Sequence, residues 1–147
     1  MKRKSLEGNI CAVARSLDII GDWWSLLIIR DAMRGVRRFS EFQRNLGAAK
    51  NILTARLKAL VNQDIFKVAP ASDGSAYQEY ILTEKGEALL PVLVALAQWG
   101  KEYLFEHSEL CAQPLDLIQK QPIEKLQLRA QDGRLLNKKD IIIGRID

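Results

Sequence analysis

The sequence predicts a mainly α-helical fold that carries one small β-hairpin. In three stretches between residues 11 and 62, apolar residues recur every three or four positions, which is the period of an amphipathic helix. Between residues 65 and 82, β-branched and aromatic residues flank an Asp73-Gly74 turn signal, which is typical of a hairpin. The length of 147 residues, of which 48% are hydrophobic, fits one main domain with an appendage.

Two helices are expected before residue 36. The first runs from about residue 11 to residue 20, and Gly21 ends it. Asp22 is expected to cap the second, which covers residues 23–33. Because this second helix is apolar almost all round, we expect it to form the buried centre of the domain.

Residues 37–68 predict two short helices joined by a tight turn and followed by a strand. Ser40 is expected to cap the first helix, with Gln43 completing a capping box. Gly47 ends this helix in the left-handed conformation that glycine tolerates best. A second helix begins near Lys50. A helix, a glycine turn and a helix with a polar outer face form a helix-turn-helix pattern.

The second helix of this pair has two different faces. Leu53, Leu57 and Leu60 fall on one side by their spacing and are expected to be buried. Asparagine, threonine and lysine side chains on the opposite side can reach base edges in the major groove of B-DNA. The residues expected on that outward side are Asn51, Thr54, Ala55, Lys58 and Asn62.

Positive charge is concentrated around this helix pair. From Arg30 to Leu60 there are eight basic and two acidic residues, a net charge of +6, whereas the whole chain carries +4. Such a local excess is the electrostatic footprint of phosphate binding. The residues that we expect to contact DNA are Arg37, Arg38, Ser40, Lys50, Asn51, Thr54, Ala55 and Lys58.

A hairpin directly after the second helix is the arrangement called a wing. Its strands are expected at residues 65–68 and 77–82, on either side of the Asp73-Gly74 turn. A wing normally lies along the sugar-phosphate backbone or in the minor groove. This hairpin has no arginine or lysine from residue 68 to residue 82, so we expect no base contact from it.

A long helix is expected from its cap, Thr83, to about His107. Pro91 is expected to kink this helix, because its ring clashes with the preceding turn and it lacks an N–H. The apolar residues of the helix cover more than one face. One face can pack on the winged domain, and a symmetry mate is the simplest partner for the other. We therefore expect a homodimer, which suits a palindromic DNA site with half-sites about 34 Å apart.

The chain is expected to divide into residues 1–107, for DNA binding and dimerisation, and residues 108–147, a small β-containing extension. In the extension, alternating apolar residues precede an Asp132-Gly133 turn. Residues 141–143 are expected to form the returning strand of a second hairpin.

Composition excludes several classes of protein. Cys11 and Cys111 are too few for a disulfide scaffold. No apolar run approaches the roughly 20 residues that span a bilayer, and the polar start predicts no signal peptide. With His107 as the single histidine, and without a nucleophile elbow, a phosphate loop or a metal cluster, we expect neither an enzyme nor a metal or other cofactor. A cytoplasmic protein without membrane association is expected.

A series of motifs points to one protein family. In order they are C-x-V-x-R, L-D-I-I-G-D-W-W-S-L-L-I-I-R-D, R-R-F-S-E-F-Q, N-I-L-T-A-R-L-K, L-T-x-K-G, L-L-P-V-L and W-G. This run, over about residues 11–106, resembles the HxlR family of winged helix-turn-helix transcriptional regulators, which are relatives of the MarR type. The resemblance implies a dimeric regulator that binds double-stranded DNA, with dimer contacts from the first and last helices of the core. The residues assigned to those contacts are Leu17, Trp99, Tyr103 and Leu104.

The resemblance also directs attention to two positions. Family members often carry a serine where this chain has Ala48-Ala49, so the cap of the second helix of the pair is expected to be missing. Cys11 lies where several members place a cysteine that senses oxidants or electrophiles. A reactive thiol needs a helix start or a nearby cation, and Arg15 is one turn away; the alternative is a small packing residue. If Cys11 is a sensor, the effector is an oxidant. If Cys11 is a packing residue, the expected effector is a small molecule in a pocket between the core and the last helix.

Two other functions are compatible with these observations. A winged helix that binds RNA would use the same charges, and competition with duplex DNA of equal length separates the two. A protein-interaction module with this fold would show no salt-dependent DNA binding.

Overall fold

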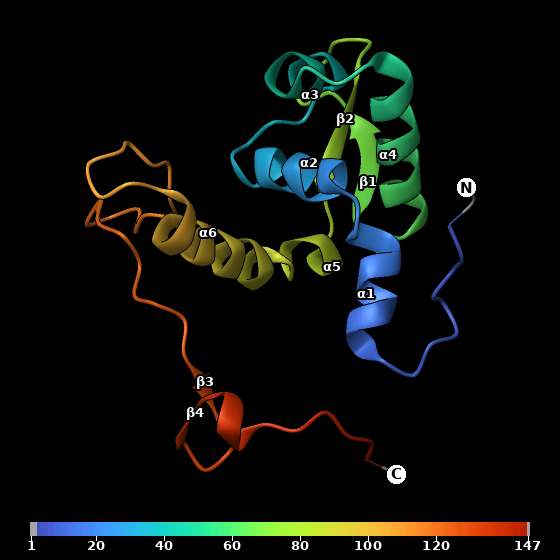
Figure 1. Cartoon of the computed structure of the whole chain (residues 1–147). Helices are drawn as coiled ribbons and strands as arrows, with labels where there is room; N and C mark the ends of the chain where they lie inside the picture. The colour runs from blue at the N-terminus through green and yellow to red at the C-terminus, as the bar shows by residue number, and fades with distance from the viewer. Residues whose placement is uncertain (1–2, 147) are drawn as a thin grey trace. The chain divides into compact units, whose positions relative to one another are not determined.

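The structure is a computed structural model of the chain, and it describes residues 3–146 (Figure 1). The outer ends of the two expected domains, at Met1, Lys2 and Asp147, lie outside the described residues. The chain forms two compact units that divide between Leu93 and Val94. No helix among residues 3–146 is long and apolar enough to cross a membrane.

The first unit is a winged helix-turn-helix, which confirms the predicted fold class. Helices α3 and α4 form the helix-turn-helix, and strands β1 and β2 pair antiparallel as the wing, with Phe66 opposite Leu82. In chain order its elements are α1 (Ala12–Ile20), α2 (Trp23–Met33), α3 (Phe39–Leu46), α4 (Lys50–Asn62), β1 (Phe66–Pro70), β2 (Gln78–Leu82), α5 (Glu84–Glu87) and the start of α6 (Leu90–Leu104).

Helix α2 is the centre of the core, as its apolar sequence predicted. Ile28 and Ile29 are fully buried. The predicted cap is also confirmed, because the Asp22 carboxylate accepts a hydrogen bond of 2.8 Å from the backbone N–H of Ser25. This bond satisfies one of the N–H groups that every helix leaves free at its start.

Helix α4 packs on the core through the face that its spacing predicted. Leu53, Leu57 and Leu60 are each 1% exposed. The rings of Phe42 and Phe66 meet edge to face with centroids 6.3 Å apart, which holds α3 against β1. Burying each such side chain contributes about 1.5–3 kcal/mol, so the angle between α3 and α4 is firmly set.

The start of α3 differs from the sequence prediction. The N-cap is Arg38, not Ser40, and no side chain caps this end of the helix, so the predicted capping box is wrong. Helix α3 begins earlier because Phe39 packs against the core, and tertiary packing contributes more to a short helix than a capping hydroxyl does. At its other end, Gly47 has the predicted left-handed conformation, with φ of 64°.

The long helix expected after Thr83 is two helices. Thr83 caps α5 as predicted, because its hydroxyl accepts a hydrogen bond of 3.1 Å from the N–H of Gly86. Helix α5 ends at Glu87 and α6 begins at Leu90. Pro91 therefore stands in the first turn of α6, where a missing N–H breaks no helical bond. The predicted kink is wrong: the helix is interrupted before the proline.

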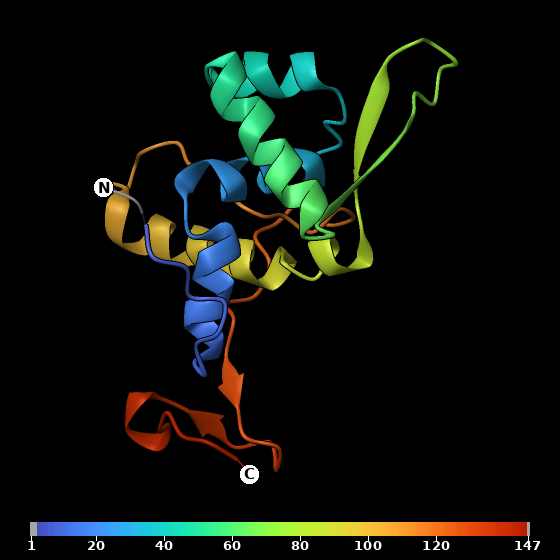
Figure 2. The ribbon, with the colours of Figure 1, turned by 90° about the vertical axis from the view of Figure 1, so that its right-hand side faces the viewer.

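The wing projects from the body of the first unit. Both views show its tip on the same side of the unit as α3 and the start of α4 (Figures 1 and 2). Gly74 turns the chain at this tip with φ of 77°, a conformation that glycine adopts without strain. The helix-turn-helix and the wing tip therefore face the same direction.

The second unit contains most of α6 and the C-terminal extension. A hairpin with a turn at Gly133 is present, as predicted, but its returning strand is not residues 141–143. The Asp132-Gly133 turn is so tight that Leu135 and Leu136 come directly opposite the first strand. The elements of this extension are β3 (Leu128–Arg129), β4 (Leu135–Leu136) and a 3-10 turn, η1 (Lys138–Asp140).

Candidate nucleic-acid interface

The outer face of α4 is a row of exposed polar and small side chains. The Thr54 hydroxyl donates a hydrogen bond of 2.7 Å to the carbonyl of Lys50, which leaves its oxygen as an acceptor. The opposite face is buried in the core, so the outer row is held at a fixed orientation. The exposed members of the row are Lys50, Asn51, Thr54, Ala55, Lys58 and Asn62.

Helix α4 begins without a side-chain cap, as the Ala48-Ala49 pair predicted. Ala49 is the N-cap and its side chain makes no hydrogen bond. The first helical bond joins the N–H of Leu53 to the carbonyl of Ala49 over 3.0 Å. The backbone N–H groups of Lys50, Asn51 and Ile52 therefore point out of the helix start without a helical acceptor, where the helix dipole favours an anion.

Half of the eight basic side chains between residues 30 and 60 are held in ion pairs. The pairs are Arg30–Asp31 (2.9 Å), Arg37–Glu79 (3.6 Å), Arg38–Asp73 (2.5 Å) and Arg56–Asp22 (3.3 Å). Within residues 3–146, no carboxylate lies within ion-pair distance of the other four. These four are Arg34, Arg44, Lys50 and Lys58. Arg44, in the last turn of α3, is a candidate that the sequence reasoning missed, although it was counted in the basic stretch.

Arg38 joins the start of α3 to the wing tip. Its Nη2 donates hydrogen bonds to Oδ2 of Asp73 and to the hydroxyl of Ser75, the latter over 3.3 Å. Its guanidinium carbon lies 5.5 Å from the ring centroid of Tyr77. The structure thus gives the wing tip a cation that residues 68–82 lack. Sequence reasoning missed Asp73 and Tyr77, because no local pattern reports a contact between residues 35 positions apart.

The Asp73 carboxylate at the wing tip is held in its ionised form. The backbone N–H of Ser75, the Ser75 side chain and the Arg38 guanidinium lower the pKa of Asp73 to about 2. In turn, the hydrogen bond to Asp73 raises the pKa of Arg38. The pair is therefore charged on both sides throughout the neutral range.

The neighbouring Arg37 contacts the second strand of the wing. Its Nη1 lies 3.6 Å from Oε2 of Glu79, a side chain that is buried. The other oxygen of Glu79 accepts hydrogen bonds from the backbone N–H and the hydroxyl of Ser72, over 3.1 and 3.0 Å. The backbone bond is the largest cause of the lowered pKa of Glu79. Two successive arginines thus attach the helix-turn-helix to two points on the hairpin.

Cys11 is the N-cap of α1, and its residue is partly exposed. The Arg15 guanidinium, which the sequence suggested as a neighbour of the thiol, donates instead to the backbone carbonyl of Asn9 over 2.5 Å. The backbone N–H of Cys11 is bonded to the Asn9 side chain over 2.9 Å. The structure therefore places Cys11 at a helix start, whereas the Arg15 side chain is bonded to the backbone at Asn9 and not to the thiol.

The four residues assigned to dimer contacts are exposed. Leu17 belongs to α1 in the first unit, and the other three belong to α6 in the second unit. The rings of Trp99 and Tyr103 are neighbours, with centroids 5.7 Å apart. The exposed fractions are 47% for Leu17, 57% for Trp99, and 66% for both Tyr103 and Leu104.

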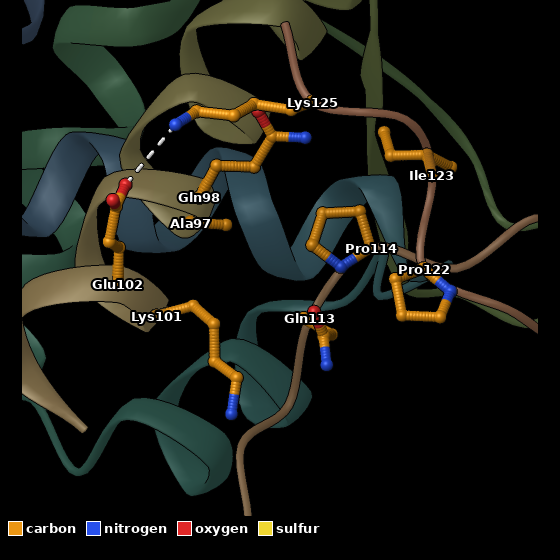
Figure 3. Close-up of a pocket in the computed structure, with 9 residues that line it drawn as sticks. All are labelled: Ala97, Gln98, Lys101, Glu102, Gln113, Pro114, Pro122, Ile123 and Lys125. Carbon is orange, nitrogen blue, oxygen red and sulfur yellow. Dashed lines mark hydrogen bonds and ion pairs between the residues drawn. The ribbon is translucent and has the colours of Figure 1, made fainter. Parts of the chain in front are cut away.

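A pocket of about 280 Å³ lies within the second unit (Figure 3). Gln98 of α6 holds the segment that closes it, because its Nε2 donates to the carbonyl of Glu124 and its Oε1 accepts from the N–H of Leu126. Lys125 and Glu102 form an ion pair of 3.4 Å at one side. The lining is largely apolar and includes Ala97, Pro114, Pro122 and Ile123.

The fold and this surface define a winged helix-turn-helix protein. Helix α4 occupies the position of the recognition helix, the second helix of the motif. The HxlR-like helix-turn-helix family matches residues 19–108 of the chain. The chain therefore belongs to the HxlR-like helix-turn-helix family of transcriptional regulators, as its motifs implied.

Individual proteins agree with this assignment. An uncharacterised HTH-type transcriptional regulator of Mycobacterium bovis is 45% identical over 93 residues, which cover 63% of this chain and 59% of that protein. The chain thus spans less than two thirds of the length of that relative. The crystal structure of PA1607, a candidate transcription factor, is 48% identical and covers 96% of this chain and 99% of its own, with a TM-score of 0.90. The redox regulator HypR in its oxidised form is 31% identical, with a TM-score of 0.55, over 63% of this chain and 96% of its own.

Proposed function

We propose that the protein binds a palindromic site in double-stranded DNA as a homodimer and regulates transcription from it. The outer face of α4 is the observation that carries this proposal. Asn51 and Lys58 are exposed on a helix whose other face is fixed in the core, and asparagine and lysine are suited to adenine and guanine edges in the major groove. Membership of the HxlR-like family supports the same function.

Phosphate contacts are proposed around this recognition helix. Lys50 and the free N–H groups at the start of α4 offer one anion-binding position. Arg37, Arg38 and Ser40 flank the start of α3, and Arg44 adds a cation without an ion-pair partner among residues 3–146. Contacts of this kind orient the protein on the duplex without reading sequence.

The homodimer is proposed to form through exposed apolar residues of α1 and α6. Between residues 95 and 146, no residue is buried, so the second unit has no core of its own. Exposed apolar surface of this kind gains stability when a second copy covers it. The residues proposed for the contact are Leu17, Trp99, Tyr103 and Leu104.

An effector is proposed to act on this dimer. The likeness to a redox regulator, together with the partly exposed thiol of Cys11 at the start of α1, favours an oxidant. The apolar pocket of the second unit is the place proposed for a small molecule if Cys11 does not respond.

Selection of binding sites from random duplex DNA, followed by fluorescence anisotropy, tests the proposal. The wild-type protein should enrich a palindrome and should bind it with an affinity that falls linearly in log K against log salt. Asn51→Ala should cost about 1–3 kcal/mol on the selected site and little on random DNA, because a base contact carries sequence information. Lys58→Ala should weaken binding while the protein stays folded.

Gln63→Ala is a matched control for Asn51→Ala. Gln63 carries an exposed side-chain amide at the C-cap of the same helix but lies outside the outer row, so its loss should leave binding unchanged. Unchanged binding in both the Asn51 and Lys58 variants would refute the docking of α4. Preferential binding of RNA over a duplex DNA of equal length would favour the RNA alternative, and the absence of salt-dependent DNA binding would favour a protein-interaction module.

A further inference from the structure

The wing tip is electrostatically unsuited to DNA by its own sequence. It has no arginine or lysine from residue 68 to residue 82, and it carries Asp73 at the turn. A wing that approaches a duplex normally meets phosphate oxygens or the minor groove, where a carboxylate is repelled. A wing tip of this kind needs a cation from another part of the chain.

Arg38 supplies that cation in a defined orientation. Three groups hold it from the wing side: the Asp73 carboxylate and the Ser75 hydroxyl, both on Nη2, and the Tyr77 ring on its face. Among residues 3–146, Nε and Nη1 of Arg38 have no hydrogen-bond partner. A guanidinium presents its N–H groups in a planar fork that matches phosphate, so the unbonded part of this fork is available to a backbone oxygen.

We infer that Arg38 is the DNA-backbone contact of the wing and that Asp73 is the residue that positions it. The inference rests on the proposed DNA binding and deepens it. Asp73, Ser75 and Tyr77 fix the rotamer of Arg38 before DNA arrives, and binding then loses less side-chain entropy than it would with a free arginine. The wing therefore acts on the duplex through a residue of the α3 start.

The Asp73→Asn variant distinguishes two effects of Asp73 on DNA binding: the positioning of Arg38 and the repulsion of DNA by its negative charge. Asparagine keeps an Oδ1 that can accept the 3.0 Å hydrogen bond from the N–H of Ser75, so the turn is preserved, but it loses the charged acceptor for Arg38. On charge alone, removal of an acid from a DNA-facing surface strengthens binding. Positioning predicts the opposite sign: affinity for the selected site should fall about twofold to tenfold, which is the effect of freeing one long side chain.

A double-mutant cycle connects the effect to Arg38. Arg38→Ala should weaken binding at least as much as Asp73→Asn, and it should reduce the slope of log K against log salt by about 1, the value for one lost phosphate contact. The Asp73→Asn/Arg38→Ala double variant should bind no more weakly than Arg38→Ala alone, because Asp73 acts only through Arg38.

Asp64→Asn is the matched control for charge. Asp64 is an exposed acid outside the wing with φ of 59°, a conformation that asparagine tolerates, and within residues 3–146 it forms no ion pair. Its removal deletes the same charge and should leave binding unchanged or slightly stronger. Thermal unfolding verifies that each variant is folded. If Asp73→Asn unfolds, Arg38→Lys gives the same test, because it keeps the charge and the turn but loses the planar fork.

The outcomes distinguish this inference from the proposed function. If Asp73→Asn and Arg38→Ala bind the selected site as tightly as the wild type, or more tightly, the inference is wrong, whereas the loss caused by Lys58→Ala preserves the proposed docking. If the wild-type protein itself shows no salt-dependent binding to duplex DNA, both the proposed function and this inference are wrong.

Discussion

The carboxylate of Asp73 has two roles: it shapes the turn at the wing tip and it binds Arg38. One oxygen accepts the N–H of Ser75 and shapes the turn, and the other accepts a hydrogen bond from Arg38, which begins a helix far away in the sequence. The turn was readable from the Asp73-Gly74 pair, since turn preferences are local. The ion pair was not, because it depends on how the wing folds back toward α3.

Acid should weaken the fold in part through Asp73. Its pKa in the folded protein is about 2, below the ordinary value of 3.8, so its contribution to stability is fully present above pH 3.8 and is lost as the pH falls toward 2. Urea unfolding at several pH values in this window should give a smaller acid-induced loss for Asp73→Asn than for the wild type. Parallel curves for the two proteins would show that the carboxylate adds nothing to stability.

Cys11→Ser should separate sensing from packing. If Cys11 is the sensor, the variant should bind the selected DNA normally when reduced and should ignore diamide or peroxide, because oxidation at the start of α1 would change the spacing of the two recognition helices. Cys111→Ser, the control, should keep the wild-type response. Wild-type binding that is unaffected by oxidant, or slow alkylation of Cys11 in the native protein, would make it a packing residue.

Patterns within one element were predicted well, and contacts between elements were not. The buried face of α4 followed from the spacing of its leucines, and the caps at Asp22 and Thr83 followed from neighbouring residues. Ser40 was mistaken for a cap because its hydroxyl fits the local pattern, while the packing of Phe39 decides where the helix starts. The same is true of the candidate site. The outer row of α4 could be predicted from the sequence, because it lies within one helix, whereas the contacts of Arg38 with the wing could not.

At the scale of elements, the packing of α5 depends on a close approach of two backbones. Gly86 is buried, and a Cβ added there would lie 2.3 Å from the backbone carbonyl oxygen of Ile65. Helix α5 can therefore pack against the start of β1 only with glycine at this position. Pro91 is compatible with a kink or with a new helix start, so the sequence alone could not distinguish the two.

Gly86→Ala should destabilise the protein by about 1–3 kcal/mol, the usual cost of overpacking. Gly100→Ala is the matched control, because that glycine lies inside α6 with open space around it. Alanine there should be neutral or should stabilise by up to about 1 kcal/mol, since alanine favours the helix. Urea unfolding measures both changes. Equal effects of the two substitutions would contradict the close packing of α5.

At the scale of the whole molecule, buried side chains are distributed unevenly. The first unit has a core of α2, α4 and the hairpin, whereas residues 95–146 contain no buried residue. The sequence predicted an unsatisfied apolar surface on the last helix, because its apolar residues cover more than one face. It could not predict that the returning strand of the extension would be Leu135–Leu136, since the three β-branched isoleucines at residues 141–143 also favour a strand.

Light scattering after size exclusion should give about twice 16.6 kDa at micromolar concentration. Leu104→Glu should reduce this mass by half or unfold the protein, because it places a charge on the proposed contact. Leu110→Glu is the control, since Leu110 is 96% exposed and lies outside α6. A wild-type protein of 16.6 kDa would remove the dimer and, with it, the reason to expect a palindrome.

The uncapped start of α4 also offers a way to detect DNA binding by amide hydrogen exchange. The amide protons of Lys50, Asn51 and Ile52 have no helical acceptor, so in the free protein they should exchange with deuterium almost as fast as those of an unstructured peptide. A phosphate oxygen seated on them would slow that exchange, and the change could be followed by NMR without a label on the DNA. A serine in place of Ala49 would accept a hydrogen bond from the N–H of Asn51 or Ile52, and DNA would then slow the exchange of that amide less. Because Ala49 leaves the start of α4 uncapped, the exchange rates of the first-turn amides should report DNA binding.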